Sequence, residues 1–373
     1  MKILITGAKG FIGKNLTAHL KEQGYEVLSF DALDNNVKEL SSLVAQSDFI
    51  VHLAGINRPT EVREFDDNYE STKTIINLIK KEKREIPLIY SSSTQAAKDN
   101  PYGKSKKRAE DLLFAFHLET KNKVFVYRLH NVFGKWSRPN YNSVIATFCN
   151  NVARDLPLTI NDPSAEVSFV YIDDVISSFI ETIKNAHLLK SEEIHYVSPI
   201  YQVKIGDLAN LLKNFKQMRS NLKVPSFVDE FEKKLYATYL SYLPSADFTY
   251  KIPSHIDNRG SFTEIIKTDE YGQFSINVIK PGITKGNHYH HTKNERFVVV
   301  SGECETCFRN INSKEIIRYK TSGREIEVID IPTGYTHSIK NIGQENAIVF
   351  MWANEPFDPN NPDTYFLEVE KNE

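Results

Sequence analysis

The sequence predicts two domains of different class, a doubly wound parallel α/β sheet followed by an all-β domain. Through the first half, short apolar segments alternate with amphipathic helical segments, which is the pattern of a parallel sheet covered by helices. A glycine-rich turn directly follows the first apolar segment. After Ile252 the pattern changes to short alternating segments broken by Gly, Pro and Asn, with little helical periodicity as far as Phe350. We therefore expect domains at residues 1–245 and 246–373. A chain of 373 residues is long for one domain and long enough for two.

The expected elements of the first domain follow one another in order. Apolar segments predict strands at 3–6, 26–30, 49–53, 88–91 and 124–128, and helical periodicity predicts helices at 16–23, 72–81 and 104–119. Ligands of such sheets bind at the carboxyl ends of the strands, so residues that directly follow a strand are candidates for function. A further helix within 226–245, ended by Pro244, is expected to link the two domains.

The first turn has the glycine spacing of a dinucleotide-binding site. Gly7, Gly10 and Gly13 permit a tight turn, a close approach of the backbone to a pyrophosphate, and close packing of the helix on the strand. Three glycines alone are a weak signal, but the required strand and helix flank them here. Asp31 ends the second strand, where a carboxylate accepts from a ribose hydroxyl. The candidate cofactor-binding residues are Gly7, Lys9, Gly10, Phe11, Ile12, Gly13, Asp31, Asp48, Leu53, Ala54, Gly55, Tyr102 and Lys106.

The stretch from Ile89 to Lys106 contains a strand that ends in three serines, a polar loop, and a helix that opens on Tyr102. Tyr102 and Lys106 are four residues apart, so the phenol and the ammonium group share one helix face. The charge of the lysine lowers the pKa of the phenol, and a nearby serine hydroxyl can hydrogen-bond the same substrate oxygen. Together these groups form a proton donor for carbonyl reduction. The alternative is an ordinary i,i+4 pair on a surface helix.

Six motifs resemble those of the extended short-chain dehydrogenase/reductase family, in the order of that family over roughly the first 240 residues. They are GAKGFIG, HLAG, SSS, YGKSK, RLHNVFG and FVYIDDV. The resemblance implies a Rossmann-type fold, a nucleotide-sugar substrate, Tyr102 as the acid, Lys106 on the nicotinamide ribose, and a serine that polarises the ketone. Ser93 is the best match for that serine, and Ser92 and Thr94 remain open.

The stretch from Asn131 to Asp162 is less regular and rich in polar residues. By the same resemblance it covers the nucleotide sugar, and the planar fork of arginine suits a diphosphate. The candidate substrate-binding residues in this stretch are Asn131, Arg138 and Arg154. The alternative is a solvated loop.

The all-β domain contains two spaced groups of metal-ligand residues. They read Gly282-x5-His288-x-His290-x4-Glu295-x6-Gly302 and Pro332-x-Gly334-x2-His337-x3-Asn341. His288 and His290 share one face of a strand, and turns can return Glu295 and His337 to the same barrel interior. Three imidazoles and a carboxylate suit a divalent metal. The alternative is a histidine-rich surface hairpin.

The two groups are similar to the two motifs of the cupin family, which implies a jelly-roll barrel. The second motif normally begins with a glycine, and Ile326 stands there in this chain, which affects backbone geometry rather than the ligand set. The segment from Asp257 to Glu264 resembles the entry strand of deoxysugar-nucleotide 3,5-epimerases, a branch of the cupins. That resemblance implies that Arg259 and Glu264 help to hold the nucleotide sugar. The alternative is an Asp-rich turn with an edge-strand pair.

Four longer phrases resemble bifunctional enzymes of capsular polysaccharide synthesis, and the resemblance covers essentially the whole chain. The phrases are RPNYNSVIATFCN, KPGITKGNH, HHTKNE and FDPNNPDTYF. The resemblance implies that the cupin domain epimerises C3 of a UDP-4-keto-2-acetamido-2,6-dideoxy-hexose. The reductase domain then reduces C4 with NADPH to UDP-2-acetamido-2,6-dideoxy-L-talose, on the route to UDP-N-acetyl-L-fucosamine. The resemblance also implies bound Zn²⁺ and a homodimer.

Two other function classes remain open. One is a 4-ketosugar reductase with a cupin that only binds sugar or metal. The other is a non-catalytic dinucleotide-binding sensor of redox state, against which the intact Tyr102 and Lys106 argue. The cofactor is a point of conflict, because Asp31 would repel a 2′-phosphate and so favours NADH. Lys9 can offset that repulsion, and we expect NADPH as the resemblance implies.

Composition excludes several classes of partner. The 46 Lys and Arg nearly balance the 48 Asp and Glu, which gives no electrostatic case for nucleic acid or an anionic membrane. No apolar run approaches the roughly 20 residues of a membrane span, and the N-terminus reads as a strand rather than a signal peptide. The three cysteines fit a reducing compartment. We expect a soluble, cytoplasmic enzyme that acts on a small nucleotide sugar.

Overall fold

The computed structural model describes residues 1–31, 37–191 and 193–370. The chain forms two compact units, which are described separately below. The first unit contains Met1–Lys213 and Glu230–Ser245, and the second contains Asn214–Asp229 and Ala246–Glu373. The chain therefore enters the second unit, returns to the first, and enters the second again. No helix in the described ranges combines the length and the apolar character needed to cross a bilayer.

The first unit is built on a six-stranded parallel sheet in the order β2-β1-β3-β4-β5-β8. The strands are β1 (Lys2–Thr6), β2 (Glu26–Phe30), β3 (Phe49–His52), β4 (Leu88–Ser93), β5 (Val124–Leu129) and β8 (Ile194–His195). A second sheet contains β6 (Asn131–Phe133), β7 (Glu166–Tyr171) and β9 (Tyr201–Lys204). This arrangement confirms the predicted doubly wound α/β fold.

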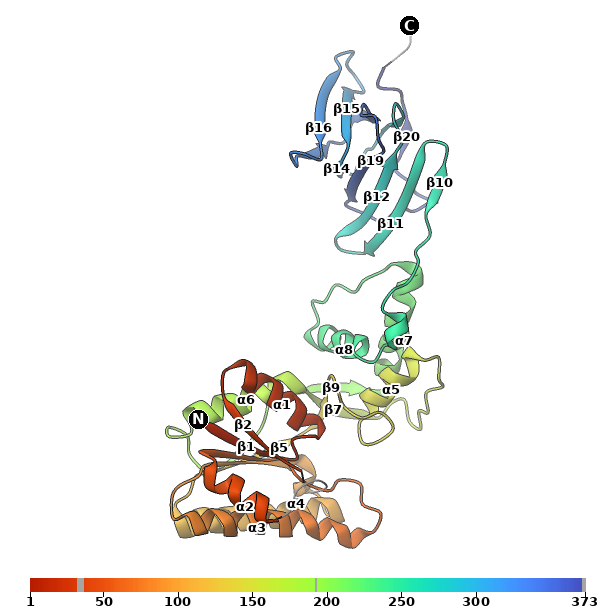
Figure 1. Cartoon of the computed structure of the whole chain (residues 1–373). Coiled ribbons are helices and arrows are strands. Elements are labelled where there is room, and N and C mark those ends of the chain that lie inside the picture. Colours follow the sequence, from red (N-terminus) through yellow and green to blue (C-terminus); the bar gives the residue numbers. More distant parts are fainter. Residues whose placement is uncertain (32–36, 192, 371–373) are drawn as a thin grey trace. The chain divides into compact units, whose positions relative to one another are not determined.

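Helices cover both faces of the parallel sheet (Figure 1). On one face, α1 (Phe11–Glu22) and α6 (Ile172–Asn185) bury Leu16, Leu20 and Phe179 against the sheet. On the other face, α2 (Val37–Gln46), α3 (Asp66–Glu82) and α4 (Pro101–Thr120) form a separate apolar layer. The remaining helices of this region are α5 (Val144–Ala153), α7 (Ile205–Asn221) and α8 (Glu230–Leu240).

The predicted elements are present, with differences at their ends. The predicted helix at 72–81 begins earlier, at Asp66, and the predicted helix at 16–23 begins at Phe11, directly after the glycine turn. The predicted linking helix is the shorter α8, and its residues group with the first unit. Four helices, α2, α5, α6 and α7, were not among the elements predicted from periodicity.

The second unit is a jelly-roll barrel of two antiparallel sheets, as predicted. The first sheet has the order β10-β11-β12-β19-β14-β17, and the second has the order β16-β15-β18-β13-β20. The strands are β10 (His255–Asp257), β11 (Gly260–Thr268), β12 (Gly272–Ile279), β13 (Thr284–Tyr289), β14 (Glu295–Ser301), β15 (Glu303–Asn310), β16 (Ile317–Ser322), β17 (Val328–Ile331), β18 (Tyr335–Asn341), β19 (Ala347–Ala353) and β20 (Tyr365–Phe366).

The polarity of the first of these sheets is unusual. On β12, three of the side chains that point into the barrel are polar, namely Gln273, Ser275 and Asn277, and Ile279 at the end of the strand is apolar. The alternate positions of the same strand point outward and are apolar. One outward row crosses four strands in register, and it consists of Ile276, Phe350, Val298 and Val328. The interior of the barrel is thus partly polar, while this outer face is apolar.

Candidate active sites

The glycine turn between β1 and α1 has the close contacts that its predicted role requires. Gly7 has a φ of +75°, and a Cβ there would lie 2.9 Å from the backbone nitrogen of Ala54. A Cβ on Gly13 would lie 2.2 Å from the carbonyl oxygen of Gly7. Only glycine permits this packing. The turn therefore lies against the Leu53–Gly55 segment that follows β3, at the carboxyl edge of the sheet.

The two predicted acidic cofactor residues lie at opposite ends of their strands. Asp31 follows β2, and both of its carboxylate oxygens lie 3.1 Å from the backbone nitrogen of Lys9 in the glycine turn. Asp48 precedes β3 and accepts from the backbone N–H of Lys2 at 2.7 Å. Asp48 is thus at the amino edge of the sheet, away from the glycine turn. We remove it from the cofactor-binding set, because it secures the start of the strand instead.

The predicted proton donor lies where β4 ends and α4 begins. Asn100 caps α4 by accepting from the backbone N–H of Gly103 at 2.8 Å, and Pro101 occupies the first turn. Burial raises the pKa of Tyr102, and a hydrogen bond with Ser93 opposes that shift. From the sequence we expect Lys106 to lower the pKa of Tyr102. In this structure burial has the larger effect and raises that pKa. Ser93 at the end of β4 and Tyr102 at the start of α4 nonetheless lie near one another, as carbonyl reduction requires.

Lys106 is buried one turn further along α4. Its ammonium group donates to the carbonyl oxygen of Ser91 at 3.0 Å and lies 4.8 Å from the ring centroid of Tyr90. Burial lowers the pKa of Lys106 to about 8, and the carboxylate of Glu110 opposes that shift. Lys106 is therefore positively charged at neutral pH, the form that stabilises a phenolate or hydrogen-bonds a ribose.

A buried hydrogen-bond network behind the site narrows the choice between Ser92 and Ser93 as the serine that polarises the ketone. The hydroxyl of Ser92 donates to the carboxylate of Glu110, which also binds Arg128 at 2.6 and 2.9 Å. Glu110 is fully buried, so this network ties β4, β5 and α4 together. The Ser92 hydroxyl is thus engaged by Glu110, whereas the Ser93 hydroxyl only accepts from the backbone N–H of Gln95 at 3.2 Å and lies near Tyr102. The geometry favours Ser93.

The three predicted substrate-binding residues of the irregular stretch differ in their surroundings. Asn131 is exposed, and its amide donates to the carbonyl oxygen of Ser168 at 3.1 Å. The guanidinium of Arg138 lies 5.4 Å from the ring centroid of Tyr141. Arg154 donates to the carbonyl oxygen of Tyr242 at 2.9 Å and therefore links α5 to the segment after α8. All three residues are exposed, and Asn131 and Arg154 each donate to a backbone carbonyl oxygen.

The second site lies inside the barrel, where His288, His290, Glu295 and His337 offer ligand atoms that all lie within 4.8 Å of one another. One oxygen of Glu295 lies 3.5 Å from His290 Nε2 and 3.4 Å from His337 Nε2. Ligand atoms about 2.1 Å from a tetrahedral zinc are about 3.4 Å apart, so these separations fit zinc. The same oxygen and these nitrogens are buried without a hydrogen-bond partner in the described part of the chain. Three nitrogens and one oxygen therefore fit a zinc ion.

A segment near the C-terminus holds the metal ligands in position. The Asp363 carboxylate accepts from the backbone N–H groups of His291, Thr292 and Lys293 at 2.7 to 3.0 Å. The Asp363 carbonyl oxygen lies 2.5 Å from Nδ1 of His290, which orients Nε2 of this imidazole toward the other ligands. These hydrogen bonds keep the pKa of the Asp363 carboxyl well below its usual range.

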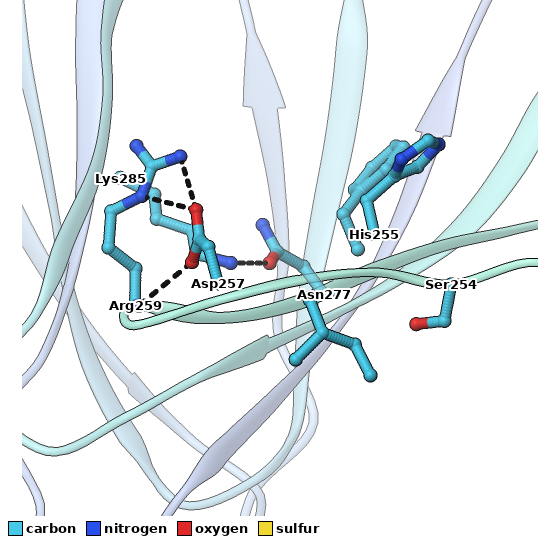
Figure 2. A pocket seen from close by; sticks show the side chains of 8 residues that line it. Ser254, His255, Asp257, Arg259, Asn277 and Lys285 are labelled. Carbon is cyan, nitrogen blue, oxygen red and sulfur yellow. Dashed lines mark hydrogen bonds and ion pairs between the residues drawn. The ribbon is translucent and has the colours of Figure 1, made fainter.

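Two connected hollows extend from the metal ligands. The inner hollow has a volume of about 410 Å³ and includes all four ligands, and the outer one has a volume of about 490 Å³. Four residues line both hollows, and they are His255, Phe262, Asn277 and Lys285. Figure 2 shows the outer hollow, where Arg259 folds onto Asp257 and Lys285 reaches Asn277. The predicted substrate residue Glu264 lines the inner hollow and pairs with Lys267 at 2.7 Å.

Comparisons with known proteins find relatives for both regions of the chain. Residues 3–197 match the model of the NAD dependent epimerase/dehydratase family, and residues 255–365 match the polysaccharide biosynthesis C-terminal domain. The structure superposes on the capsular polysaccharide assembling protein CapF from Staphylococcus aureus with a TM-score of 0.92 and 45% identity, covering 99% of this chain and 100% of that chain. The chain belongs to the NAD dependent epimerase/dehydratase family and is of the CapF type.

Two curated relatives of this CapF-type chain are reductases. The UDP-2-acetamido-2,6-beta-L-arabino-hexul-4-ose reductase of Pseudomonas aeruginosa is 44% identical over 371 residues, which cover 99% of each chain. The dTDP-4-dehydro-6-deoxyglucose reductase of Escherichia coli is 25% identical over 224 residues, which cover 48% of this chain and 71% of the relative.

Several residues of the cupin site of this CapF-type chain were not found by sequence reasoning. Lys285 and Asn277 meet in the cavity from different strands, and Asp363 reaches the metal ligands from 73 positions beyond His290. The motif KPGITKGNH contains Lys285, but an i,i+3 spacing from His288 predicts opposite faces of a strand. No local pattern marks these three residues.

Proposed function

We propose that the chain is a bifunctional nucleotide-sugar enzyme of capsule or surface polysaccharide synthesis. Its substrate is a UDP-linked 4-keto-2-acetamido-2,6-dideoxy-hexose, which the cupin domain epimerises at C3 and the first domain reduces at C4. The product is UDP-2-acetamido-2,6-dideoxy-L-talose. The observation that carries the proposal is the placement of Ser93 at the end of β4, near Tyr102 at the start of α4, one turn before the buried Lys106 and at the same sheet edge as the glycine turn. The names of the two reductase relatives support it.

In the reductase site, this chain's residues manage a proton and a developing charge. A nicotinamide cofactor held at the glycine turn would supply the hydride for C4. Ser93 donates a hydrogen bond to the C4 oxygen and polarises the ketone, and Tyr102 gives that oxygen its proton. The charge of Lys106 favours the resulting phenolate of Tyr102. Glu110 retains that charge on Lys106 against the effect of burial.

Epimerisation should precede reduction because of carbonyl chemistry. A ketone at C4 makes the C3 proton acidic, since its removal gives an enolate, and reduction removes that ketone. We expect deuterium from D2O to enter C3 of the keto sugar without reduced cofactor, and not to enter the finished alcohol. Proton NMR of the two incubations checks this order. Deuterium in the alcohol, or a C3 position that stays protonated in the keto sugar, would contradict it.

One observation favours a second candidate function, a reductase whose cupin domain is not catalytic. The cluster offers four protein ligand atoms, the number that structural zinc centres use, whereas catalytic zinc keeps one position open. If the zinc is structural, either the cupin domain is inactive or other residues of the cavity act on the sugar. The D2O incubation of the keto sugar separates the two functions, because an inactive cupin domain gives no exchange.

We propose NADPH as the reductant, although Asp31 argues for NADH. The Asp31 carboxylate already accepts from the Lys9 backbone, and the Lys9 side chain is the candidate cation for a 2′-phosphate. We expect kcat/KM to be higher with NADPH than with NADH, and Lys9→Met to reduce that preference about tenfold or more. Lys14→Met, on an exposed residue of α1, is the matched control. A wild-type kcat/KM for NADH that equals or exceeds that for NADPH would refute the assignment.

We further propose a homodimer that buries the apolar outer face of the barrel. Phe350 and Val328 on this face are 36% and 59% exposed, and they belong to the row that crosses four strands. Contiguous apolar patches of this kind mark interfaces. We expect Phe350→Glu to convert a dimer into a monomer, as measured by light scattering. Ile317→Glu, on an exposed residue of the other sheet, should leave the mass unchanged.

A further inference from the structure

The ring of Tyr90 lies beside the ammonium group of Lys106 in the reductase site. Tyr90 and Ser92 are two residues apart on β4, so their side chains share the face of the sheet that packs against α4. Lys106 extends from α4 toward the same face, and its Nζ lies 4.8 Å from the ring centroid of Tyr90. At that distance the electron-rich face of an aromatic ring attracts a cation, most strongly where water is excluded.

The ammonium group of Lys106 has three donor hydrogens in a buried place. One of them goes to the carbonyl oxygen of Ser91 at 3.0 Å. The group also packs closely on the segment after β3, because a Cβ on Gly55 would lie 3.1 Å from Nζ. The Ser91 carbonyl and the ring of Tyr90 take two of the three donor directions, which leaves a donor for a ribose hydroxyl of the cofactor.

One carboxylate favours the charge of Lys106, and it is already shared with other groups. Glu110, on the same helix, opposes the effect of burial on the pKa of Lys106. Its two oxygens accept from Arg128 on β5 at 2.6 and 2.9 Å, and one of them also accepts from Ser92. In the part of the chain that the structure describes, no carboxylate forms an ion pair with Lys106. A further stabilising contact for this charge therefore comes from the ring of Tyr90.

The other polar groups that face Lys106 are neutral. Burial raises the pKa of Tyr102 on the same helix and that of Tyr90 on β4, so both phenols stay protonated. On β3, burial and the charge of Lys106 lower the pKa of His52 to about 3, and its imidazole is therefore uncharged. Asn68 of α3, which meets Gly55 from the other side, carries no charge. The ring of Tyr90 is the neutral group placed against the ammonium itself.

We propose that Tyr90 is a positioning residue of the reductase site, whose ring keeps the ammonium group of Lys106 charged and directed toward the cofactor and Tyr102. The role rests on the proposed function and deepens its reduction step. A ring stabilises a buried cation without adding a full negative charge, which would disfavour the phenolate that Tyr102 forms during reduction. The ring face also presents no oxygen acceptor that would compete with a ribose hydroxyl.

The test compares Tyr90→Leu, which removes the ring, with Tyr90→Phe, which keeps it. Phe125→Leu is the matched control, because it opens a similar hollow on the neighbouring strand β5, in the apolar layer on the other face of the sheet. Tyr90→Met fills more of the space with a flexible side chain and repeats the comparison where Tyr90→Leu folds poorly. Reduction of the UDP-4-keto sugar by NADPH is followed on the full chain from neutral to alkaline pH.

The expected result is a shift of the alkaline limit of the reaction. The charged form of Lys106 is present below its pKa of about 8 and is lost as the pH rises through that value. Loss of the ring favours the neutral lysine, so the alkaline midpoint of kcat/KM for NADPH should fall by about one pH unit in Tyr90→Leu and Tyr90→Met. Tyr90→Phe should recover the wild-type midpoint, and Phe125→Leu should not move it.

A binding measurement without turnover gives a second readout. The dissociation constant of NADPH, followed by nicotinamide fluorescence, should rise where Lys106 loses its charge, and in Tyr90→Leu that rise should begin about one pH unit lower. Wild-type midpoints in both ring-less variants overturn the role of Tyr90. An equal shift in Tyr90→Phe or in Phe125→Leu also overturns it, because the hydroxyl or the packing would then be responsible. Absence of reduction by the wild type overturns the reductase function, whereas the binding profile still tests Tyr90.

Discussion

Replacing Tyr102 by Phe is expected to abolish carbonyl reduction, with a loss of about 10²- to 10⁴-fold in kcat/KM. The change removes only the phenolic hydroxyl, and it leaves the ring in its half-buried place at the start of α4. Reduction then lacks the group that gives the C4 oxygen its proton. The measurement is the oxidation of reduced nicotinamide in the presence of the UDP-4-keto sugar.

The matched control for this prediction is Tyr25→Phe, which lies beside the core at the start of β2. It should leave the rate unchanged. Exchange at C3 should also persist in Tyr102→Phe, because the cupin cavity is formed wholly by residues of the second unit. If Tyr102→Phe lost C3 exchange together with reduction, the two reactions would share one composite site.

Replacing Glu295 by Ala is expected to remove bound zinc and to destabilise the barrel. The change removes one of four ligands and leaves buried nitrogens of His290 and His337 without their common partner. Each unsatisfied buried polar group costs about 1–3 kcal/mol, and the stabilisation from metal binding is lost as well. We expect zinc to fall from one equivalent per chain to a trace, with a clear drop in the melting temperature of the barrel.

Metal analysis and calorimetry of the purified variant check this result. His290→Ala should behave in the same way, because it removes another ligand. Glu270→Ala, at an exposed turn between β11 and β12, is the control and should change neither the zinc content nor the melting temperature. An unchanged zinc stoichiometry in Glu295→Ala would exclude this residue from the ligand set.

The parts of the site that lie close together in the sequence were predictable, and the parts assembled by long-range geometry were not. Gly7 to Gly13 and Tyr102 to Lys106 are local spacings that a strand-to-helix turn or one helix face decides. The clustering of the four candidate metal ligands was also predicted, because the period of a strand places His288 and His290 on one face. Lys285 was missed because a bulge reverses the face that simple alternation assigns to it.

Two other discrepancies have equally specific causes. Asp48 was predicted as a cofactor residue, but it lies at the amino end of its strand, where β3 begins. Arg154 was predicted from its chemistry alone, and the chain folds so that the carbonyl oxygen of Tyr242, 88 residues later, accepts from it. Residue type indicates what a side chain can bind, but the partner it meets depends on tertiary packing.

The path of the chain between its two units has a consequence for any attempt to study them apart. The segment Asn214–Asp229 belongs to the second unit, where Leu222 and Val224 exchange backbone hydrogen bonds with Lys267 at 2.8 and 2.9 Å. Expressing residues 246–373 alone would remove this pairing from β11 and leave its edge open. A single cut after Ser245 would therefore leave part of the second unit, Asn214–Asp229, attached to the first.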